Sequence, residues 1–464
     1  MISVRIKKSK LCFSDNGKSS EIDIPPSKSH SLRALILAAF ADSPSEIENI
    51  LMSGDIETAV SVLQTFGVKT EIYKNDSGIF TAKVVPPKNG IKEFILKSKN
   101  RPLIIDAGNS GSVFYFLGAA FTALPVSFIF TGDVSLCKRP AAPLIEIYNA
   151  LGINYEFLVS ENYAPITVTG KNLNSFQTCS LSGNFSQPIS GLLFSAALRN
   201  GGLAVNLKTA GELPYLRMTV EWLKRCGIQC RHSRNFKKFK FDGGQKLQAV
   251  KTVIPGDWSS AAFPIAAAIA SNSELKLKNL DITDVQGDRE IVSILRQMNT
   301  PMHYDKNDKS LTVFPHNGKL TGGEFDLSDM PDAVPALSAI ACFAKGKTVL
   351  KNIGICRFKE CDRIAAVCSE LGKFGADVTS ESDFLIIQGK GGDGLHCGET
   401  YSYGDHRIAM MSIAMSLGLT CRKTSGFTGE DFSVIRDTEC IDVTYPLFIE
   451  DLKKCGASLD VIAH

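Results

Sequence analysis

The sequence lacks paired cysteines and closely spaced histidines. Its thirteen cysteines are scattered singly without a C-x-x-C pair, a pattern that predicts free thiols in a reducing compartment rather than a disulfide framework or a zinc site. The seven histidines show no H-x-x-x-H spacing, which argues against a built-in metal centre. We therefore expect no resident metal ion.

A strong net charge and long apolar runs are also missing. The net charge is only +3, so no nucleic-acid partner is indicated. The longest apolar runs, such as 261–270, are too short to cross a bilayer, and the first ten residues have no apolar stretch behind their positive charges, so we expect neither a membrane span nor a signal peptide. With 44% hydrophobic and 21% charged residues over 464 positions, the chain is typical of a cytoplasmic globular protein of two or three domains.

What the sequence does have is a repeat. Six segments share a small or polar lead-in followed by an alanine-rich apolar helix, at intervals of roughly 75 residues. They begin near Ser27, Asn109, Gly183, Asp257, Asp332 and Asp405. Because these helices are apolar on nearly every side, we expect them to be buried within a layer of sheets.

A second series of six amphipathic helices follows in step. Each is predicted to end at a glycine or asparagine in the left-handed conformation, which commonly follows a helix. The predicted caps are Gly67, Gly152, Gly227, Asn299, Gly375 and Gly456. Strand-like runs between the helices complete six β-α-β-α-β-β units, which we expect to form two halves of three units, because one unit is too small to bury its own helix.

Charged and polar side chains gather where these helices begin. The densest group is Lys359-Glu360-Cys361-Asp362-Arg363, which we place at the start of a helix that ends near Gly372. A single acid there, such as Asp332 or Asp405, is explained by N-capping, and a charge cluster by local ion pairs. Six positive helix ends on opposed faces would instead attract anionic ligands.

Seven motifs in chain order decide between these explanations. They are P-x-S-K-S-x-S-x-R, G-N-S-G, T-G-D-x-S-L-x-x-R-P, G-D-x-S-S-A, P-D-A, R-x-K-E-x-D-R and D-H-R, from Pro25 onward. Together they resemble the 5-enolpyruvylshikimate-3-phosphate synthase family over about Pro25 to Pro446. The resemblance implies a two-domain inside-out α/β barrel of the enolpyruvyl transferase type, with six β-α-β-α-β-β units and an active site in the interdomain cleft. The expected domains are 1–25 with 254–464, and 26–253.

The resemblance also implies a reaction: the enolpyruvyl group of phosphoenolpyruvate moves to the 5-hydroxyl of shikimate 3-phosphate, through a tetrahedral intermediate, and phosphate leaves. No cofactor is implied, and we expect a monomer. Carried over by motif, the catalytic residues are Lys28, Asp332, Glu360 and His406. The phosphoenolpyruvate ligands are Lys28, Asn109, Gly111, Arg139, Arg363 and Arg407. The shikimate 3-phosphate ligands are Lys28, Ser29, Arg33, Ser186, Gln187, Tyr215, Asp332 and Lys359.

Some positions depart from the family pattern. Phe185 replaces a serine of the phosphate-binding S-S-Q, and Glu212 stands where a serine commonly precedes the P-Y pair. A carboxylate at 212 would repel a phosphate, so the acceptor pocket is the part whose chemistry is altered. Tyr115 and Val443 differ as well, and the effect of each on substrate binding or on glyphosate sensitivity is left open.

Two alternatives remain. One is a non-catalytic or acceptor-shifted relative, favoured by Phe185 and Glu212. The other is the sister transferase acting on UDP-N-acetylglucosamine, which carries a cysteine five residues before an arginine-proline pair. Here Cys137 precedes Arg139 by only two, which argues against that family.

Overall fold

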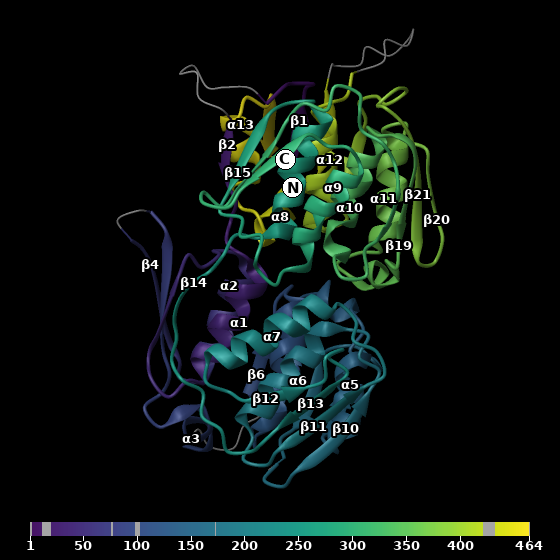
Figure 1. Ribbon diagram of the computed structural model, residues 1–464. Coiled ribbons are helices and arrows are strands. Elements are labelled where there is room, and N and C mark those ends of the chain that lie inside the picture. The colour runs from purple at the N-terminus through teal and green to yellow at the C-terminus, as the bar shows by residue number, and fades with distance from the viewer. Residues whose placement is uncertain are drawn as a thin grey trace. The chain divides into compact units, whose positions relative to one another are not determined.

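The computed structural model describes residues 2–11, 20–75, 78–97, 103–171, 173–420 and 432–463. The chain divides into two compact units. One, the split body, combines Met1–Pro25 with Pro255–His464, and the other, the continuous body, is Pro26–Ile254. Figure 1 traces the elements of each body.

The described residues form six four-stranded sheets, three in each body. Those of the continuous body, in spatial order, are β14 (Lys251–Val253), β3 (Ser45–Glu48), β5 (Phe80–Val85) and β4 (Lys69–Lys74); β6 (Leu103–Asp106), β7 (Phe128–Thr131), β9 (Ile166–Thr169) and β8 (Asn154–Phe157); β10 (Gln177–Leu181), β11 (Leu203–Leu207), β13 (Lys238–Phe241) and β12 (Cys230–His232). Those of the split body are β2 (Glu21–Asp23), β15 (Leu275–Lys278), β17 (Ser310–Val313) and β16 (Met302–Asp305); β18 (Glu324–Asp326), β19 (Lys345–Lys351), β21 (Phe384–Lys390) and β20 (Val378–Ser380); β22 (Glu399–Tyr401), β23 (Ser433–Arg436), β1 (Ile2–Ile6) and β24 (Leu459–Ala463).

All six sheets share one topology. The first two strands pair in parallel and the other neighbours are antiparallel. A parallel pair needs a crossover; in four of the sheets it runs through the buried helix between the two strands, and the pairs β14–β3 and β2–β15 are the exceptions. The six-unit repeat predicted from the sequence is confirmed by this common pairing.

Two strands do not stay with the helix that follows them in the chain. Strand β2 runs into the first helix of the continuous body but pairs with β15 of the split body, and β14 runs into Trp258–Ala270 but pairs with β3 of the continuous body. In each body, one sheet therefore takes its first strand from the stretch of chain that leads out of that body: β2 in the split body and β14 in the continuous body. The repeat spacing cannot reveal this exchange, because it leaves the order of the elements unchanged.

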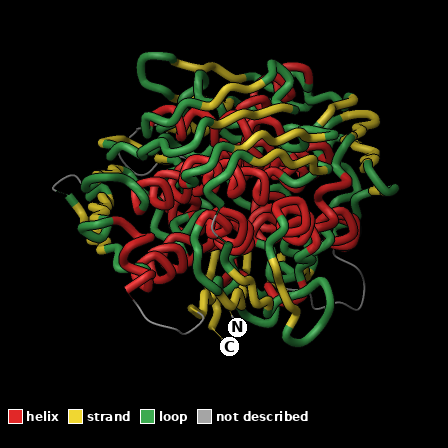
Figure 2. Tube along the Cα trace, turned by 90° about the horizontal axis from the view of Figure 1, so that it is seen from below, coloured by secondary structure: helices red, strands yellow, loops and turns green. Residues whose placement is uncertain are grey.

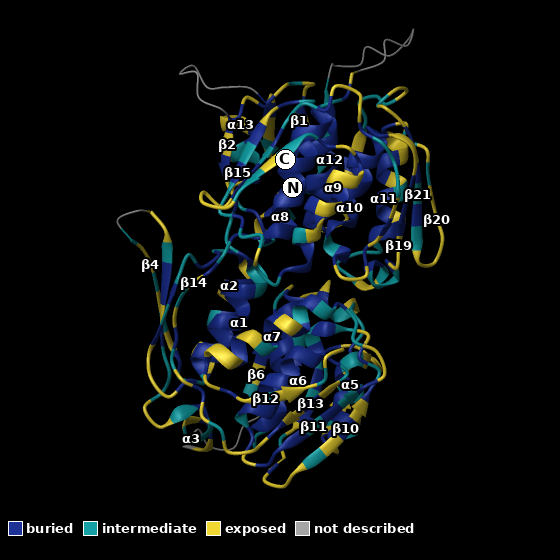
Figure 3. Cartoon of the chain, viewed as in Figure 1, coloured by how far each residue is buried: buried dark blue, intermediate teal, exposed yellow. Residues whose placement is uncertain are grey.

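The six helices of the first series are buried, as their composition predicts. They are α1 (Lys28–Ala39), α4 (Gly111–Ala120), α6 (Ser186–Leu198), α8 (Trp258–Ala270), α10 (Val334–Cys342) and α12 (His406–Ser416). Every residue of α8, α10 and α12 is buried, and Figure 3 shows these helices in the colour for buried residues. In Figure 2 many strands lie toward the outside of the helices.

The helices of the second series are amphipathic, since each buries only part of its residues. Its members are α2 (Gly54–Thr65), α5 (Ala142–Leu151), α7 (Leu213–Arg225), α9 (Ile291–Gln297), α11 (Arg363–Lys373) and α13 (Phe448–Lys454); a short α3 (Gly90–Lys97) lies outside the series. The caps are confirmed: all six predicted residues have positive φ, from 59° at Asn299 to 92° at Gly456. No helix among the described residues is long and apolar enough to cross a membrane.

Candidate active site

The charge cluster at 359–363 lies between a 3-10 helix, η5 (Gly354–Phe358), and the first turn of α11. Asp362 caps α11, accepting a hydrogen bond from the Ala365 N–H at 3.0 Å, and it also pairs with Arg357 at 2.7 Å. That part of the cluster is an ordinary helix start. Glu360 and Arg363 instead take part in a different set of contacts.

Arg363 binds three carboxylates with its three nitrogens. Its Nε donates to Asp405 Oδ2 at 2.7 Å, its Nη1 to Asp332 Oδ1 at 2.7 Å, and its Nη2 to Glu360 Oε2. The guanidinium is 1% exposed. A fork of fixed donors suits this task, because each nitrogen faces a different acceptor.

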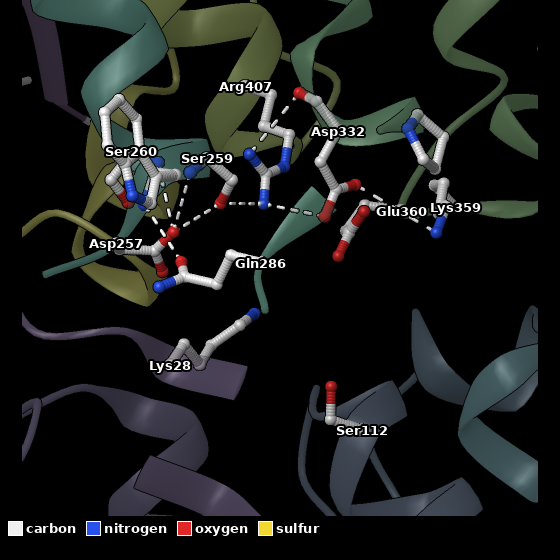
Figure 4. A network of polar contacts seen from close by, with 12 residues as sticks. Lys28, Ser112, Asp257, Ser259, Ser260, Gln286, Asp332, Lys359, Glu360 and Arg407 are labelled. Carbon is white, nitrogen blue, oxygen red and sulfur yellow. Dashed lines mark hydrogen bonds and ion pairs between the residues drawn. The ribbon is translucent and has the colours of Figure 1, made fainter. Parts of the chain in front are cut away.

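A second arginine extends the network to α8. Arg407 Nη2 donates to Asp332 Oδ2 at 3.0 Å and to Ser259 Oγ at 3.2 Å (Figure 4). Ser259 lies in the first turn of α8, which Asp257 caps, and Arg407 lies in the first turn of α12, which Asp405 caps. The N-terminal ends of α8, α10 and α12 therefore meet around Asp332.

The cations keep Asp332 ionised. Burial alone would raise the pKa of Asp332, but Arg407, Lys359 and Arg363 outweigh it and hold that pKa well below the usual range. The Lys359 Nζ lies 4.0 Å from Asp332 Oδ1. Burial would lower the pKa of Arg363, but Asp405, Glu360 and Asp332 raise it well above its usual value. Asp332 is thus an anion held among three cations.

N-capping explains Asp257 and Asp405 but not Asp332. Asp332 lies in the 3-10 helix η4 (Pro331–Ala333), one residue before Ala333, the N-cap of α10, and both of its carboxylate oxygens accept hydrogen bonds from arginines. The capping interpretation is wrong there because the helix proper begins two residues later, at Val334. His406, the remaining predicted catalytic residue of this body, is the first residue of α12 and is 1% exposed.

Sequence reasoning missed one acid in this cluster, Asp288. It lies in the 3-10 helix η3 (Gly287–Glu290), is 2% exposed, and has a pKa raised to about 8, first by burial and then by Asp332 and Asp257, against Arg407. No local pattern marks it, because an acid between a strand and an amphipathic helix is typical of an ordinary loop.

In the continuous body, Arg139 and Asn109 meet at the start of α4. Arg139 Nη2 donates to Asn109 Oδ1 at 2.9 Å, and Asn109 Nδ2 donates to Asp133 Oδ2 at 2.8 Å. Gly111 is the first residue of α4, and a Cβ there would lie 2.6 Å from Arg139 Nη1. The absence of a side chain at 111 therefore lets the guanidinium lie against the helix end.

Lys28 and Arg33 lie on the first turns of α1 but in different surroundings. Lys28 Nζ pairs with Asp55 Oδ2 at 2.9 Å. Arg33 is 1% exposed, donates to Thr219 Oγ1 at 2.9 Å and to the Ser29 carbonyl at 2.9 Å, and lies 4.9 Å from the centre of the Phe116 ring. Burial lowers the pKa of Arg33 to about 10, opposed by Tyr215 and Glu212.

The start of α6 is occupied by a carboxylate. Glu212 Oε2 accepts hydrogen bonds from Ser186 N–H at 3.1 Å and from Ser186 Oγ at 2.8 Å. Ser186 is the first residue of the helix and not its cap, which is Phe185. Gln187 Nε2 donates to Ser112 Oγ at 3.0 Å, which joins the starts of α6 and α4.

Comparison with known proteins identifies the family. A family model described as EPSP synthase (3-phosphoshikimate 1-carboxyvinyltransferase) matches residues 16–452. A 3-phosphoshikimate 1-carboxyvinyltransferase of Ruminiclostridium cellulolyticum is 37% identical, over 96% of this chain and 98% of that protein. One of Acetivibrio thermocellus is 35% identical, over 98% and 99%. The chain belongs to the EPSP synthase family.

Solved structures agree with this assignment at the level of the fold. An EPSP synthase of Acinetobacter baumannii superposes with a TM-score of 0.75 at 24% identity, and the enolpyruvyl transferase NikO of Streptomyces tendae with 0.74 at 15%; the match covers 99% or more of each chain. The predicted family and the predicted inside-out α/β fold class are confirmed. Among the described residues the sheets stay separate and close no barrel.

The EPSP synthase motifs fall into two groups in space. Asp332, Lys359, Glu360, Arg363 and Arg407 form one connected network in the split body. In the continuous body the predicted residues make smaller contacts: Lys28 with Asp55, Arg139 with Asn109, Arg33 with Ser29 and Tyr215, and Ser186 with Glu212. Their roles toward substrates stay predictions.

The cysteines depart from expectation at one position. Ten of the described cysteines are free thiols, but Cys397 is disulfide-bonded. The prediction of free thiols is wrong there, because the spacing of cysteines along a chain does not reveal which of them fold together. Within the described part of the chain, no group of three or more histidine, cysteine or acidic side chains is arranged to hold a metal ion.

Proposed function

We propose that the clusters described above carry out the reaction of this family: transfer of the enolpyruvyl group of phosphoenolpyruvate to the 5-hydroxyl of shikimate 3-phosphate, with release of phosphate. The protein is a transferase of the shikimate pathway, which leads to the aromatic amino acids. The observation that carries the mechanism is the network in which Arg363 joins Asp332 to Glu360.

Binding of phosphoenolpyruvate requires cations, because the substrate carries a phosphate and a carboxylate. Arg363 and Arg407 of the split body, with Lys28 and Arg139 of the continuous body, supply them, and the Asn109–Gly111 turn offers backbone N–H groups at the start of α4. Guanidinium groups suit both anions because they donate in pairs. Arg139 is held against Gly111 in an orientation fixed by Asn109.

The two carboxylates divide the proton transfers. The methylene carbon of phosphoenolpyruvate must gain a proton while the acceptor hydroxyl loses one. Asp332, whose pKa is held well below the usual range by Arg407, Lys359 and Arg363 against its burial, carries no proton near neutral pH and so is not the donor. We therefore assign the donor role to Glu360 and the acceptor role to Asp332.

Charge changes in the tetrahedral intermediate are met by the same cations. Addition of the hydroxyl to the enolpyruvyl carbon and later loss of phosphate move negative charge between oxygens, and fixed donors at both positions lower the barrier. Lys28 and His406 are the further donors that we assign to this step. We assign the binding of shikimate 3-phosphate to Ser29, Ser186, Gln187, Tyr215 and Lys359, with Arg33 in a supporting role.

Arg33 fits a supporting role in this pocket. All three of its guanidinium nitrogens donate to protein oxygens, on Thr219, Ser29, Ser190 and Tyr215. We propose that it acts on the acceptor through its positive charge and through the positions of Ser29 and Tyr215.

The product identifies the acceptor. Purified protein is incubated with phosphoenolpyruvate and either shikimate 3-phosphate or UDP-N-acetylglucosamine, and the products are analysed by mass spectrometry. We expect the carboxyvinyl ether of shikimate 3-phosphate and no product from the sugar nucleotide. A product only from UDP-N-acetylglucosamine, or from neither acceptor, would contradict the proposed function.

We also propose that the protein acts in the cytoplasm as a monomer. Ten free thiols among the described cysteines support a reducing compartment, against the one disulfide at Cys397, and every site residue assigned above is supplied by one chain. Light scattering of the purified protein tests the second point: a mass near 50.3 kDa is expected, and twice that mass would contradict it.

A further inference from the structure

Helix α6 begins without a cap of its own. The residue at the N-cap position is Phe185, which makes no side-chain cap hydrogen bond, and a phenyl ring has no acceptor to offer. The N–H groups at a helix start otherwise need an acceptor, and the helix dipole favours a negative charge there.

Glu212 provides that acceptor from another part of the chain. Its Oε2 accepts from both the N–H and the Oγ of Ser186, and the two residues are 1% and 7% exposed, Ser186 being the more buried. A carboxylate that takes both donors of one serine at a helix start has the contacts that an oxygen of a bound phosphate would make.

The backbone holds Glu212 in this position. Residues 208–211 continue the pairing of β11 with β10, since Thr209 N–H donates to the Ser182 carbonyl and Gly211 N–H to the Gly183 carbonyl, both at 2.9 Å. Glu212 itself has φ 50° and ψ 50°, a left-handed conformation that is unfavourable for a residue with a side chain. The contact to Ser186 is therefore built into the loop rather than made by a freely rotating surface side chain.

The charge balance around this contact involves one buried cation. Arg33 is buried beside Tyr215, and Glu212 is one of the two groups that oppose the lowering of its pKa by burial. In the free protein, Glu212 provides a negative charge for Arg33. A substrate phosphate arriving at Ser186 would add up to two more negative charges next to a carboxylate.

We propose that Glu212 determines acceptor affinity by occupying the Ser186 donors as an internal anion, which the phosphate of the acceptor must displace. The inference rests on the proposed function for the identity of the acceptor. Phe185 and Glu212 then form one coupled change: the first removes the local cap, and the second restores it from across the loop and makes phosphate binding compete with a side chain.

The test is binding of shikimate 3-phosphate without phosphoenolpyruvate, measured by calorimetry. Glu212→Gln keeps an oxygen that can accept from Ser186 but removes the charge, so we expect the Kd to fall about tenfold, which matches the repulsion of one charge by a dianion a few ångströms away in a partly solvated pocket. Unphosphorylated shikimate should bind the variant and the wild type equally. The KM for phosphoenolpyruvate should not change.

The chain offers a matched control in Glu146. Its carboxylate accepts from Ser182 N–H at 2.6 Å and from Ser182 Oγ at 2.7 Å, which is the same pair of donors on a serine that begins no helix. Glu146→Gln should leave the Kd for shikimate 3-phosphate as in the wild type. Glu212→Ser removes the charge by another route and should tighten binding as well, which keeps the test open if Glu212→Gln folds poorly.

Each outcome decides the proposal. Unchanged or weaker binding of shikimate 3-phosphate by both Glu212 variants, no binding by any protein, or an equal gain for unphosphorylated shikimate would overturn it. Because binding requires no turnover, a wild type that forms no product would count against the proposed function, while a gain of binding in Glu212→Gln would still support displacement of Glu212.

Discussion

Arg363 donates its Nε hydrogen to Asp405 Oδ2 across 2.7 Å, with both side chains essentially excluded from solvent at 1% and 0% exposure. The other two nitrogens of the same guanidinium donate hydrogen bonds to Asp332 and Glu360. The Asp405 contact therefore fixes the orientation in which Arg363 holds the two carboxylates that we assign to proton transfer.

Removing the charge of Asp405 should destabilise the split body. Asp405→Asn can still cap α12 but leaves Arg363 with one fewer partner, and losing one side of a buried pair costs on the order of 3 kcal/mol of unfolding free energy. Urea denaturation measures it, followed by the fluorescence of Trp258 in a Trp222→Phe background, because the chain has one tryptophan in each body.

An exposed ion pair provides the control. Arg231 and Asp242 are 2.7 Å apart but 66% and 69% exposed, so Asp242→Asn in the continuous body should cost less than about 1 kcal/mol. This control is followed through Trp222 in a Trp258→Phe background. Losses of similar size in the two variants would contradict the structural role assigned to Asp405.

Stability should fall as the pH rises from about 4 to about 8, through Asp288. Burial first, and then Asp332 and Asp257, raise the pKa of this carboxyl to about 8 in the folded protein, from 3.8. The folded state therefore holds a proton that the unfolded chain has lost, which reduces stability by up to about 1.4 kcal/mol for each pH unit in that window. Asp332, whose pKa is depressed, contributes in the opposite direction and only below its unfolded value of 3.8.

Asp288→Asn should remove the part of this slope that Asp288 contributes. Urea denaturation at several pH values from 5 to 8 measures the free energy of unfolding of the wild type and of the variant. The value for the variant should increase relative to that of the wild type as the pH rises. Asp281→Asn is the control, because the pKa of Asp281 is lowered to about 2 and its titration lies below the window. Parallel pH profiles for the wild type and Asp288→Asn would show that Asp288 does not hold the proton.

A methyl group at position 111 should weaken phosphoenolpyruvate binding without unfolding the protein. The new Cβ would lie 2.6 Å from Arg139 Nη1, and a long side chain can move away from it at little cost. We expect Gly111→Ala to raise the KM for phosphoenolpyruvate about tenfold, as a misplaced bidentate donor would, while the Kd for shikimate 3-phosphate is kept.

Gly54→Ala is the matched control for that prediction. Gly54 also begins a helix, α2, but a Cβ there meets nothing within 4 Å. Its KM for phosphoenolpyruvate should equal that of the wild type. An unchanged KM in Gly111→Ala would mean that the position of Arg139 does not matter for this substrate.

The elements of the fold could be predicted where the determinants are local. The left-handed caps at Gly67 and Asn299 could be predicted because glycine and asparagine tolerate positive φ. The burial of α8 and α12 could be predicted because neither helix has a polar face. The family resemblance placed residues 1–25 with 254–464, but the pairing of β2 with β15 and of β14 with β3 could not be predicted from local pattern, because strand pairing depends on contacts between segments far apart in the chain.

In the candidate site, too, single residues could be predicted from the sequence, but the contacts between them could not. Motifs indicated Asp332, Glu360 and Arg363 one by one, but only the folded chain shows that one guanidinium joins the two carboxylates. The sequence showed only that Glu212 puts a carboxylate where a phosphate is expected to bind. Its contact with Ser186, 26 residues earlier, depends on how β10 and β11 align. Asp288 gave no signal, because the burial that raises its pKa comes from packing.

The most direct test of the account is phosphate release from phosphoenolpyruvate by the wild type and by Glu360→Gln, with and without shikimate 3-phosphate. We predict release that depends on shikimate 3-phosphate and that falls by a factor on the order of 10³ in Glu360→Gln, since a general acid contributes about that much. Glu290→Gln, at an exposed acid of the same body, should retain full activity. Phosphate release at the same rate with and without shikimate 3-phosphate, or at the wild-type rate in Glu360→Gln, would contradict the central claim.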